Sequence, residues 1–357
     1  MRLWVFLAAA VFFATPSPAA DFNPPLERLI ANYIRPATAE FAASVEKLPG
    51  AVTGICADNR PETAEAFRSA YSGSLQAFSR IQFLRFGPLL EDDRLSRLAF
   101  LPDPRGIVQR QIRKIYAQKD PGVGSAESLK DKSVAVQGFP ALQLIAFDKD
   151  SDVVLGRPGA DKDYTCGYAL AIALNLAAIA VEVDADWADP DGYSALLLSG
   201  GPQNERYRTS QEAMEDVFNA LVTGLIIVRD QDLLPALGAS ATKAKANRLP
   251  FSRSGNSILY LSGELQSIQN AVASLGLEAV TPSDFQWIFN ALGFEFGNAQ
   301  TLLSELTPPL RQTFKDDDAY SRISVLAITV KSIRDTMALE LAGALELAGG
   351  FNALDGD

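Results

Sequence analysis

Two charged residues fall on apolar stripes of the sequence, where a charged side chain needs a partner. Arg85 lies one turn beyond a stripe with steps of three or four residues, made of Phe67, Tyr71, Ser74, Phe78 and Ile81. Glu295 lies on a second such stripe, made of Phe285, Ile288, Leu292, Ala299 and Leu302. Burying a charge without a partner is costly. We therefore expect these residues either to neutralise each other, or other buried groups, in a structural ion pair, or to line a polar cavity for a ligand.

The segment Gly138-Phe139-Pro140-Ala141-Leu142-Gln143 interrupts an otherwise helical run. Pro140 lacks an amide hydrogen, and its ring clashes with the carbonyl group of Val136, so the helix must kink or restart here. A broken helix exposes carbonyl acceptors, and Gln143 lies on the same helix face as Pro140. The break is either a packing kink or the wall of a ligand site.

The absence of histidine limits the chemistry that this chain can perform. The sequence contains none, which excludes Ser–His and Cys–His catalysis and any histidine-based zinc site. A site of carboxylate, amide and tyrosine oxygens for a hard cation remains open. We assign no catalytic residue and no metal ligand, and we leave the cofactor unknown.

The elements that carry these residues are predicted to be helices throughout. Apolar residues recur with helical spacing nearly everywhere, and no stretch alternates as a strand would. We predict helices over 26–47, 61–86, 105–118, 126–147, 161–187, 209–234, 255–275, 282–304 and 317–347. The helix over 161–187 is apolar almost all round and is expected at the centre of the fold. Asn175 and Glu182 share one of its faces, and a buried Glu182 would need a partner.

Glycine and proline residues divide the chain into two parts. They cluster between 188 and 208, which we interpret as the joint between an N-terminal lobe (21–200) and a C-terminal lobe (201–350). A second stretch, 238–255, is polar and lacks periodicity, so it is expected to form a long loop. Loops of this length are often functional.

Residues 1–20 have the pattern of a secretory signal. Arg2 precedes an apolar core from Leu3 to Phe13, and small residues follow, with cleavage expected after Ala19 or Ala20. No cysteine follows that site, so we expect a free, soluble periplasmic protein without a transmembrane segment in the mature chain. The formal charge of −11 argues against nucleic acid or anionic membranes as partners.

The chain has two cysteines, Cys56 and Cys166. In an oxidising compartment two cysteines most simply form one disulfide. We predict this bond, which would close a loop of about 110 residues.

These segments resemble the imelysin family, helical exported bacterial proteins that include iron-regulated proteins and a proposed metallopeptidase. The family hallmark G-x-H-x-x-E aligns with Gly138 to Gln143, but Pro140 replaces the histidine and Gln143 the glutamate. The supporting segments are Arg85-Phe86-Gly87-Pro88, Phe100-Leu101-Pro102-Asp103-Pro104-Arg105-Gly106, Ser133-Val134-Ala135-Val136-Gln137-Gly138, Asn204-Glu205-Arg206-Tyr207-Arg208, Gly224-Leu225, Val228-Arg229-Asp230 and Ser252-Arg253-Ser254-Gly255. The resemblance implies an all-α fold of two four-helix lobes, with the site between them.

Our leading hypothesis is a non-enzymatic periplasmic binding or accessory protein, which family resemblance links to iron or metal uptake. Its ligand site is expected to comprise Arg85, Gly138, Pro140, Gln143, Asp230, Arg253, Ser254 and Glu295. The ligand is a small molecule or metal, or else an envelope protein partner. The alternative is an imelysin-type metallopeptidase that uses another constellation, such as Glu182 and Asp186 with a metal.

Overall fold

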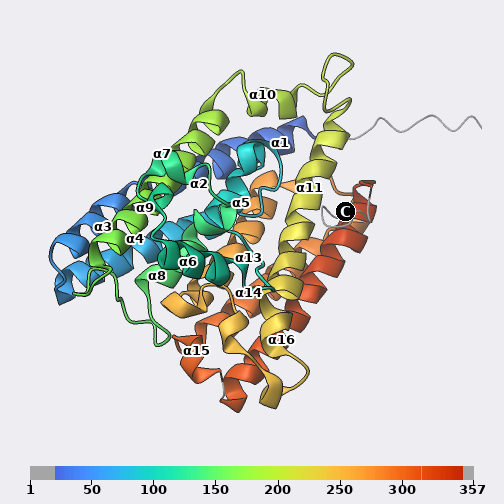
Figure 1. Cartoon of the computed structure of the whole chain (residues 1–357). Helices are drawn as coiled ribbons and strands as arrows, with labels where there is room; N and C mark the ends of the chain where they lie inside the picture. Colours follow the sequence, from blue (N-terminus) through green and yellow to red (C-terminus); the bar gives the residue numbers. More distant parts are fainter. Residues whose placement is uncertain (1–20, 315, 349–357) are drawn as a thin grey trace, which may run out of the picture.

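The structure, a computed structural model, describes residues 21–314 and 316–348. Within these residues the chain is helical and contains no β-strand, only one isolated bridge between Phe147 and Val153. The prediction of an all-α fold with two helical lobes is confirmed (Figure 1). The signal sequence expected over 1–20 lies outside the described residues.

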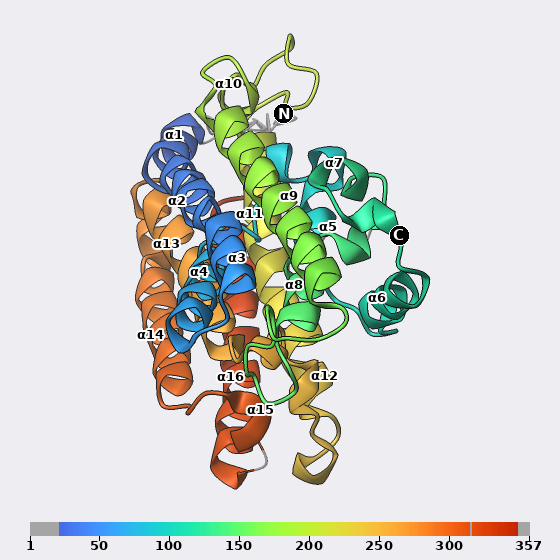
Figure 2. The same cartoon turned by 60° about the vertical axis from the view of Figure 1, so that its left-hand side comes forward.

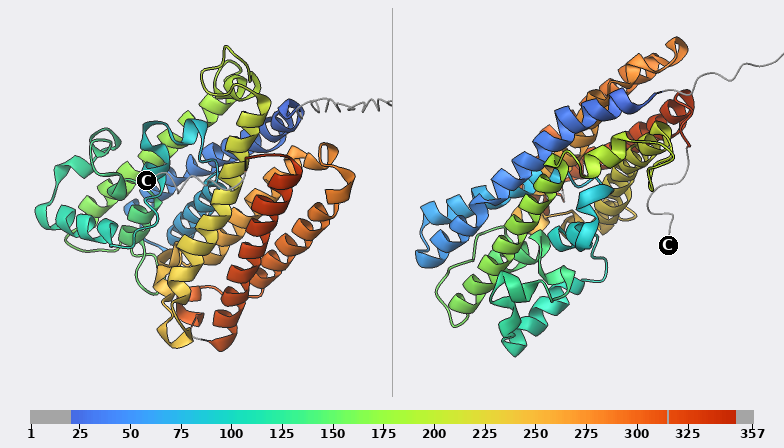
Figure 3. Two further views of the ribbon diagram at one scale, coloured as in Figure 1. Left: turned by 90° about the vertical axis from the view of Figure 1, so that its right-hand side faces the viewer. Right: turned by 90° about the horizontal axis from the view of Figure 1, so that it is seen from above.

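The N-terminal lobe is a bundle built around one long rod, which is the dark blue element in the right-hand view of Figure 3. The rod consists of α1 (Asn23–Leu29), the π-helical turn η1 (Ile30–Ile34), α2 (Arg35–Val45) and α3 (Lys47–Ala57). Two further helices complete the bundle, α4 (Pro61–Ser79) and α9 (Lys162–Ala188). The rod was expected to end at residue 47. It continues to Ala57 because Pro49 falls in the first turn of α3, where its missing amide hydrogen breaks no bond.

The C-terminal lobe is a second bundle, with its long helices side by side in the left-hand view of Figure 3. Its elements are α11 (Ser210–Ile226), the π-helical segment η6 (Ile227–Leu233), α12 (Leu234–Leu237), α13 (Ser257–Leu275), α14 (Trp287–Ser304), α15 (Leu310–Thr313), α16 (Asp317–Asp335), the π-helical segment η12 (Thr336–Leu341) and α17 (Ala342–Ala344). The stretch 238–255 is a loop with three short 3-10 turns, as predicted.

The two lobes meet along α4 and α13, whose backbones come close together. A Cβ atom added at Gly263 would lie 1.9 Å from the Ser79 hydroxyl oxygen, so only glycine permits this approach. Beside this contact, the rings of Phe78 and Tyr260 stack with their centroids 6.4 Å apart. The buried apolar residues of the two lobes therefore form one continuous core.

Shorter helices fill the segment between α4 and α9 and cover one side of the N-terminal lobe (Figure 2). They are α5 (Arg94–Leu98), α6 (Ile107–Gln118), α7 (Ala126–Leu129) and α8 (Phe139–Ala146), and a further short helix, α10 (Tyr193–Leu198), follows α9. The helix predicted over 126–147 is broken into α7, a 3-10 turn at Val134–Val136 and α8. This is the restart that Pro140 demands.

Helix α9 is not the central buried helix that was predicted: one face packs against the N-terminal bundle, and the other meets solvent, with Leu174 44% and Val181 57% exposed (Figure 2). It is long and apolar enough to cross a membrane by composition, but more than half of its most apolar stretch is buried inside the protein. Asn175 is buried and accepts a hydrogen bond from Arg97 Nη2 at 2.8 Å. The expectation of a buried Glu182 is wrong, because its side chain is 45% exposed at the surface and pairs with Arg94 at 3.4 Å.

The predicted disulfide between Cys56 and Cys166 is present and joins α3 to α9. The two Cα atoms are 5.9 Å apart, and 110 residues separate the cysteines in sequence. The bond therefore fixes the far end of the rod to α9.

We predict that replacing both cysteines, in Cys56→Ala/Cys166→Ala, lowers the free energy of unfolding by about 4 kcal/mol, because the unfolded chain gains the entropy of a long open loop. Urea denaturation monitored by circular dichroism measures the change. Wild-type protein treated with a reductant serves as the matched control and should show a similar loss. An unchanged midpoint would contradict the prediction.

Candidate functional site

The degenerate motif begins at a tight contact between two helices. Gly138 precedes α8, and a Cβ atom at this position would lie 2.2 Å from the carbonyl oxygen of Leu98 in α5. Pro140 occupies the first turn of α8, where its missing amide hydrogen leaves no bond unmade. Gly138 and Pro140 therefore set the position and the starting point of α8.

The carbonyl groups exposed by the helix break are bound by side chains of the surrounding helices. Tyr168 on α9 donates its hydroxyl hydrogen to the carbonyl oxygen of Val136 at 2.7 Å. Tyr71 on α4 donates to the carbonyl oxygen of Phe139 at 3.1 Å, and the Asn175 amide donates to that of Gln137 at 3.3 Å. These carbonyl groups are therefore structural and do not face a ligand.

A cavity of about 430 Å³ lies between α8 and the loop over 247–253 of the C-terminal lobe, with Pro140 and Gln143 in its wall. Its other lining residues include Phe100, Leu101, Asp103, Leu144, Gln231, Asp232, Asn247, Arg248, Pro250, Phe251, Ser252, Arg253 and Arg311. A cavity of this size is in the range of small-molecule sites. It is the place where the degenerate motif meets the C-terminal lobe.

Two hydrogen bonds hold the loop of the C-terminal lobe against α8. The Ser254 amide donates to Gln143 Oε1 at 3.3 Å, and Arg253 Nη1 donates to the carbonyl oxygen of Phe147 at 2.9 Å. The structure thus brings together four of the residues predicted to form the site, namely Pro140, Gln143, Arg253 and Ser254.

Beside the cavity lies a buried polar group formed by Gln82, Arg85, Asp232, Tyr260 and Glu264. The Gln82 amide donates to Glu264 Oε1 at 2.6 Å. Asp232 Oδ2, Glu264 Oε2 and Arg85 Nε are buried without a hydrogen-bond partner from the described residues. A small cavity of about 20 Å³ touches Arg85 and Asp232, and Asp232 also lines the large cavity. The buried group therefore lies directly behind the cavity wall.

The two carboxyl groups hold protons more tightly than carboxyl groups in water do. Burial raises the pKa of Asp232 to about 7, while hydrogen bonding to a protonated Glu264 and the charge of Arg85 oppose this rise. Burial, followed by the negative charge of Asp232, raises the pKa of Glu264 well above its ordinary value. When one of the two carboxyl groups carries a proton, it can donate a hydrogen bond to the other.

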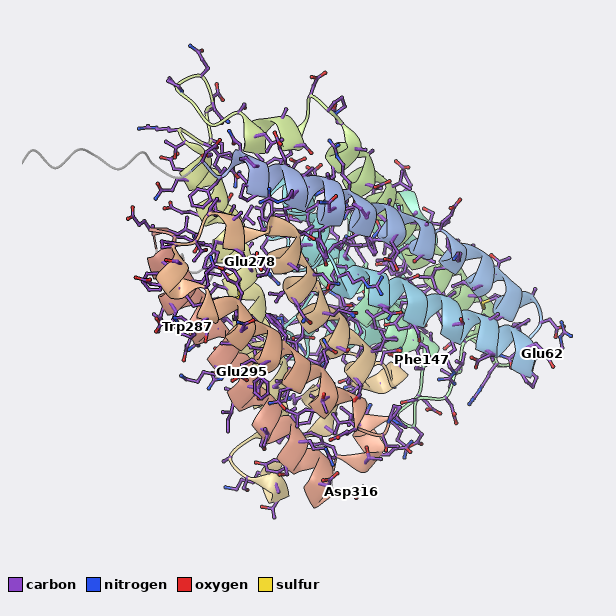
Figure 4. All side chains as sticks on the ribbon, turned by 180° about the vertical axis from the view of Figure 1, so that it is seen from behind. Glu62, Phe147, Glu278, Trp287, Glu295 and Asp316 are labelled. Carbon is purple, nitrogen blue, oxygen red and sulfur yellow. A yellow bond between two sulfur atoms is a disulfide. The ribbon has the colours of Figure 1, made fainter. Side chains whose placement is uncertain are left out.

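Four residues predicted to belong to the site, Gly138, Asp230, Ser254 and Glu295, line neither of these cavities, and of these Asp230 and Glu295 lie away from α8. Asp230 forms an ion pair with the adjacent Arg229 near the surface. Glu295 on α14 accepts a hydrogen bond from Ser332 at 3.3 Å, and Figure 4 shows it well apart from Phe147 at the end of α8. Among the described residues no salt bridge joins Arg85 to Glu295, so the ion pair considered from the sequence is not formed.

Sequence reasoning missed Asp232 and Glu264, which occupy the interior in place of Asp230 and Glu295. Glu264 follows Tyr260 by one helical turn on the buried face of α13, so the rule that singled out Arg85 applies to it as well. Asp232 lies in the π-helical segment η6, whose wider turn departs from the helical spacing used to place residues. That segment gives no comparable signal in the sequence.

The metal that the family's motif implies does not fit the residues found here. Pro140 offers no donor atom, and Gln143 Oε1 already accepts the Ser254 amide. Across residues 21–314 and 316–348, no three His, Cys, Asp or Glu side chains gather in a way that could hold a metal ion. Glu182 and Asp186, the alternative pair, both contact Arg94, at 3.4 and 2.6 Å.

The chain belongs to the imelysin family, also termed peptidase M75, whose model matches residues 30–336. Among solved structures, the fold is similar to an imelysin-like protein from Psychrobacter arcticum, with a TM-score of 0.76, 17% identity, and 92% of this chain and 97% of that chain covered. It is also similar to a "putative iron-regulated protein A precursor" from Parabacteroides distasonis, with a TM-score of 0.71, 12% identity and coverage of 90% and 98%. A search of curated proteins finds none that matches.

We predict that Gly138→Ala destabilises the protein by about 1–3 kcal/mol, because the new methyl group collides with the backbone of α5. Gly50→Ala is the control, since open space surrounds that position in α3; alanine there is expected to leave stability unchanged or to raise it by up to about 1 kcal/mol. Thermal and urea unfolding measure both variants. Equal effects in the two would show that the contact at Gly138 is not tight.

We predict that the free energy of unfolding falls on the order of 2 kcal/mol as the pH rises from about 5 to 8. Because the pKa values of Asp232 and Glu264 are raised in the folded state, the folded protein binds more protons than the unfolded chain in this range. Glu264→Gln should flatten this dependence, whereas the exposed control Glu278→Gln should not. Urea unfolding at several pH values measures it, and equal slopes in both variants would contradict this assignment.

Proposed function

We propose that this chain is a periplasmic imelysin-like binding or accessory protein that performs no catalysis. Its ligand would occupy the cavity between α8 and the loop 247–253. The observation that carries the proposal is the cavity itself, because the position of the family's motif borders a space of ligand size while its side chains offer binding contacts without a metal-binding donor set. Pro140 can only shape this wall, and neutral Gln143 can only form hydrogen bonds.

Two observations support a location in the periplasm. The Cys56–Cys166 disulfide is a bond that persists in oxidising compartments, and residues 1–20 have the composition of an export signal. The proposal of a link to iron or metal uptake rests on the name of the similar protein from Parabacteroides distasonis. An envelope protein partner is the alternative to a small ligand.

Native mass spectrometry of the exported protein tests the proposal. We expect wild-type protein to carry a small adduct that Gln143→Ala loses, because Gln143 borders the cavity and holds the loop. Gln266→Ala, an exposed position on α13, is the matched control and should retain the adduct. Elemental analysis of the same samples distinguishes a metal from an organic ligand, and an adduct of protein size would indicate an envelope partner.

The competing function is peptidase activity at a non-histidine metal site. The family's peptidase name favours it, while the contacts of Arg94 with Glu182 and Asp186 count against that pair as metal ligands. An assay with casein, with and without a chelator, separates the two. Chelator-sensitive cleavage that Glu182→Gln abolishes would refute the binding-protein proposal.

A further inference from the structure

Basic residues outnumber acidic residues around the cavity, whereas acidic residues outnumber basic ones in the chain as a whole. The chain has 43 acidic and 32 basic residues, yet the cavity is lined by three arginines and two aspartates. These residues are Arg248, Arg253, Arg311, Asp103 and Asp232. An excess of arginine inside an acidic protein attracts an anion locally.

The two aspartates do not neutralise the three arginines. Asp103 caps α6, since its Oδ1 accepts the Ile107 amide at 2.7 Å and its Oδ2 accepts the Val108 amide at 2.9 Å. Asp232 lies at the boundary with the buried polar group, where burial favours its protonated form. Neither carboxyl group forms a salt bridge with an arginine of the cavity within the described part of the chain.

The hydrogen bonds that Arg248 and Arg253 donate go to backbone oxygens, and none of the three arginines forms a salt bridge within the described residues. Arg253 Nη1 donates to the carbonyl oxygen of Phe147 at 2.9 Å, and Arg248 Nη1 donates to that of Pro104 at 3.3 Å. Arg253 lies close enough to Arg311 that burial and the charge of Arg311 both lower its pKa, against the opposing charge of Asp148. Two half-buried guanidinium groups that repel each other are stabilised by an anion between them.

The rest of the cavity wall is largely apolar. Phe100, Leu101, Leu144, Pro140, Pro250 and Phe251 line it beside the arginines. A volume of about 430 Å³ accommodates a small molecule. The wall therefore combines guanidinium groups with apolar side chains.

We propose that this cavity binds a small organic carboxylate, an inference that rests on the proposed binding function and specifies its ligand class. The carboxylate group is held by Arg253 and Arg311, and the hydrocarbon body lies against the apolar wall around Pro140 and Phe251. Arginine suits this role because its planar group can donate two parallel hydrogen bonds to a carboxylate.

Isothermal titration calorimetry of the full exported chain with four six-carbon probes tests this inference. We expect hexanoate to bind at least tenfold more tightly than hexanol or hexylamine, and more tightly than hexyl phosphate. Arg311→Gln should weaken hexanoate binding about tenfold, and Arg253→Gln/Arg311→Gln should abolish it. Arg208→Gln, at an exposed position outside the cavity wall, is the matched control and should bind as wild type does.

Arg311→Gln is the decisive variant, since the Arg311 side chain makes no hydrogen bond within the described residues and its loss should leave the fold intact. Circular dichroism checks the fold of each variant. Hexanol binding as tightly as hexanoate, tighter binding of hexyl phosphate, unchanged binding in Arg311→Gln, or no binding of any probe would each overturn the inference. A neutral adduct in native mass spectrometry would refute the carboxylate while leaving the proposed binding function in place.

Discussion

The missing amide hydrogen of Pro140 fixes where α8 begins, and the geometry of the cavity follows from that starting point. Because α8 restarts at Phe139, the carbonyl groups of the broken segment need donors, and Tyr71 and Tyr168 supply them from α4 and α9. The short helix is thereby tied to two long helices of the N-terminal lobe. Its exposed side then faces the loop of the other lobe, where Gln143 meets Ser254.

The interior shows a division of electrostatic roles. Gln82, Arg85, Asp232, Tyr260 and Glu264 form an interior group in which burial raises the pKa of both carboxyl groups. The arginines on the other side of Asp232 face the cavity and keep their charge. Burial makes the first arrangement costly and proton-dependent, whereas access to solvent makes the second available to a ligand.

The sequence predicted most of the long helices because the apolar spacing of amphipathic helices is a strong signal. The helix expected over 61–86 is shorter: α4 ends at Ser79, so Arg85 lies in the segment that follows it and not on a helical stripe. The sequence also predicted the restart at Pro140, the loop over 238–255 and the disulfide. It placed Glu182 inside because α9 is apolar on all sides, which hides the face that meets solvent. Such a helix carries no periodic information about its orientation, and only the surrounding helices determine it.

The site was predicted less completely than the fold. Pro140, Gln143 and Arg253 line one cavity and Ser254 contacts Gln143, and all four lie in segments that the family resemblance singled out. Asp232 was missed because a π-helical turn changes the register of η6, and Arg248 and Arg311 were missed because residues on loops and short turns have no periodicity to depart from. The surroundings of a side chain on a loop or a short turn depend on tertiary contacts, which the spacing of residues in the sequence does not reveal.

The close crossing of α4 and α13 at Gly263 bears on how a ligand exchanges with solvent. Because the two lobes share a continuous core, a hinge motion between them would have to separate buried apolar surfaces. The loop carrying Arg253, by contrast, is held to α8 by only a pair of hydrogen bonds. Exchange of the proposed ligand would therefore require that loop to move, and would depend on these two hydrogen bonds and on the buried contact of Phe251 with Tyr260.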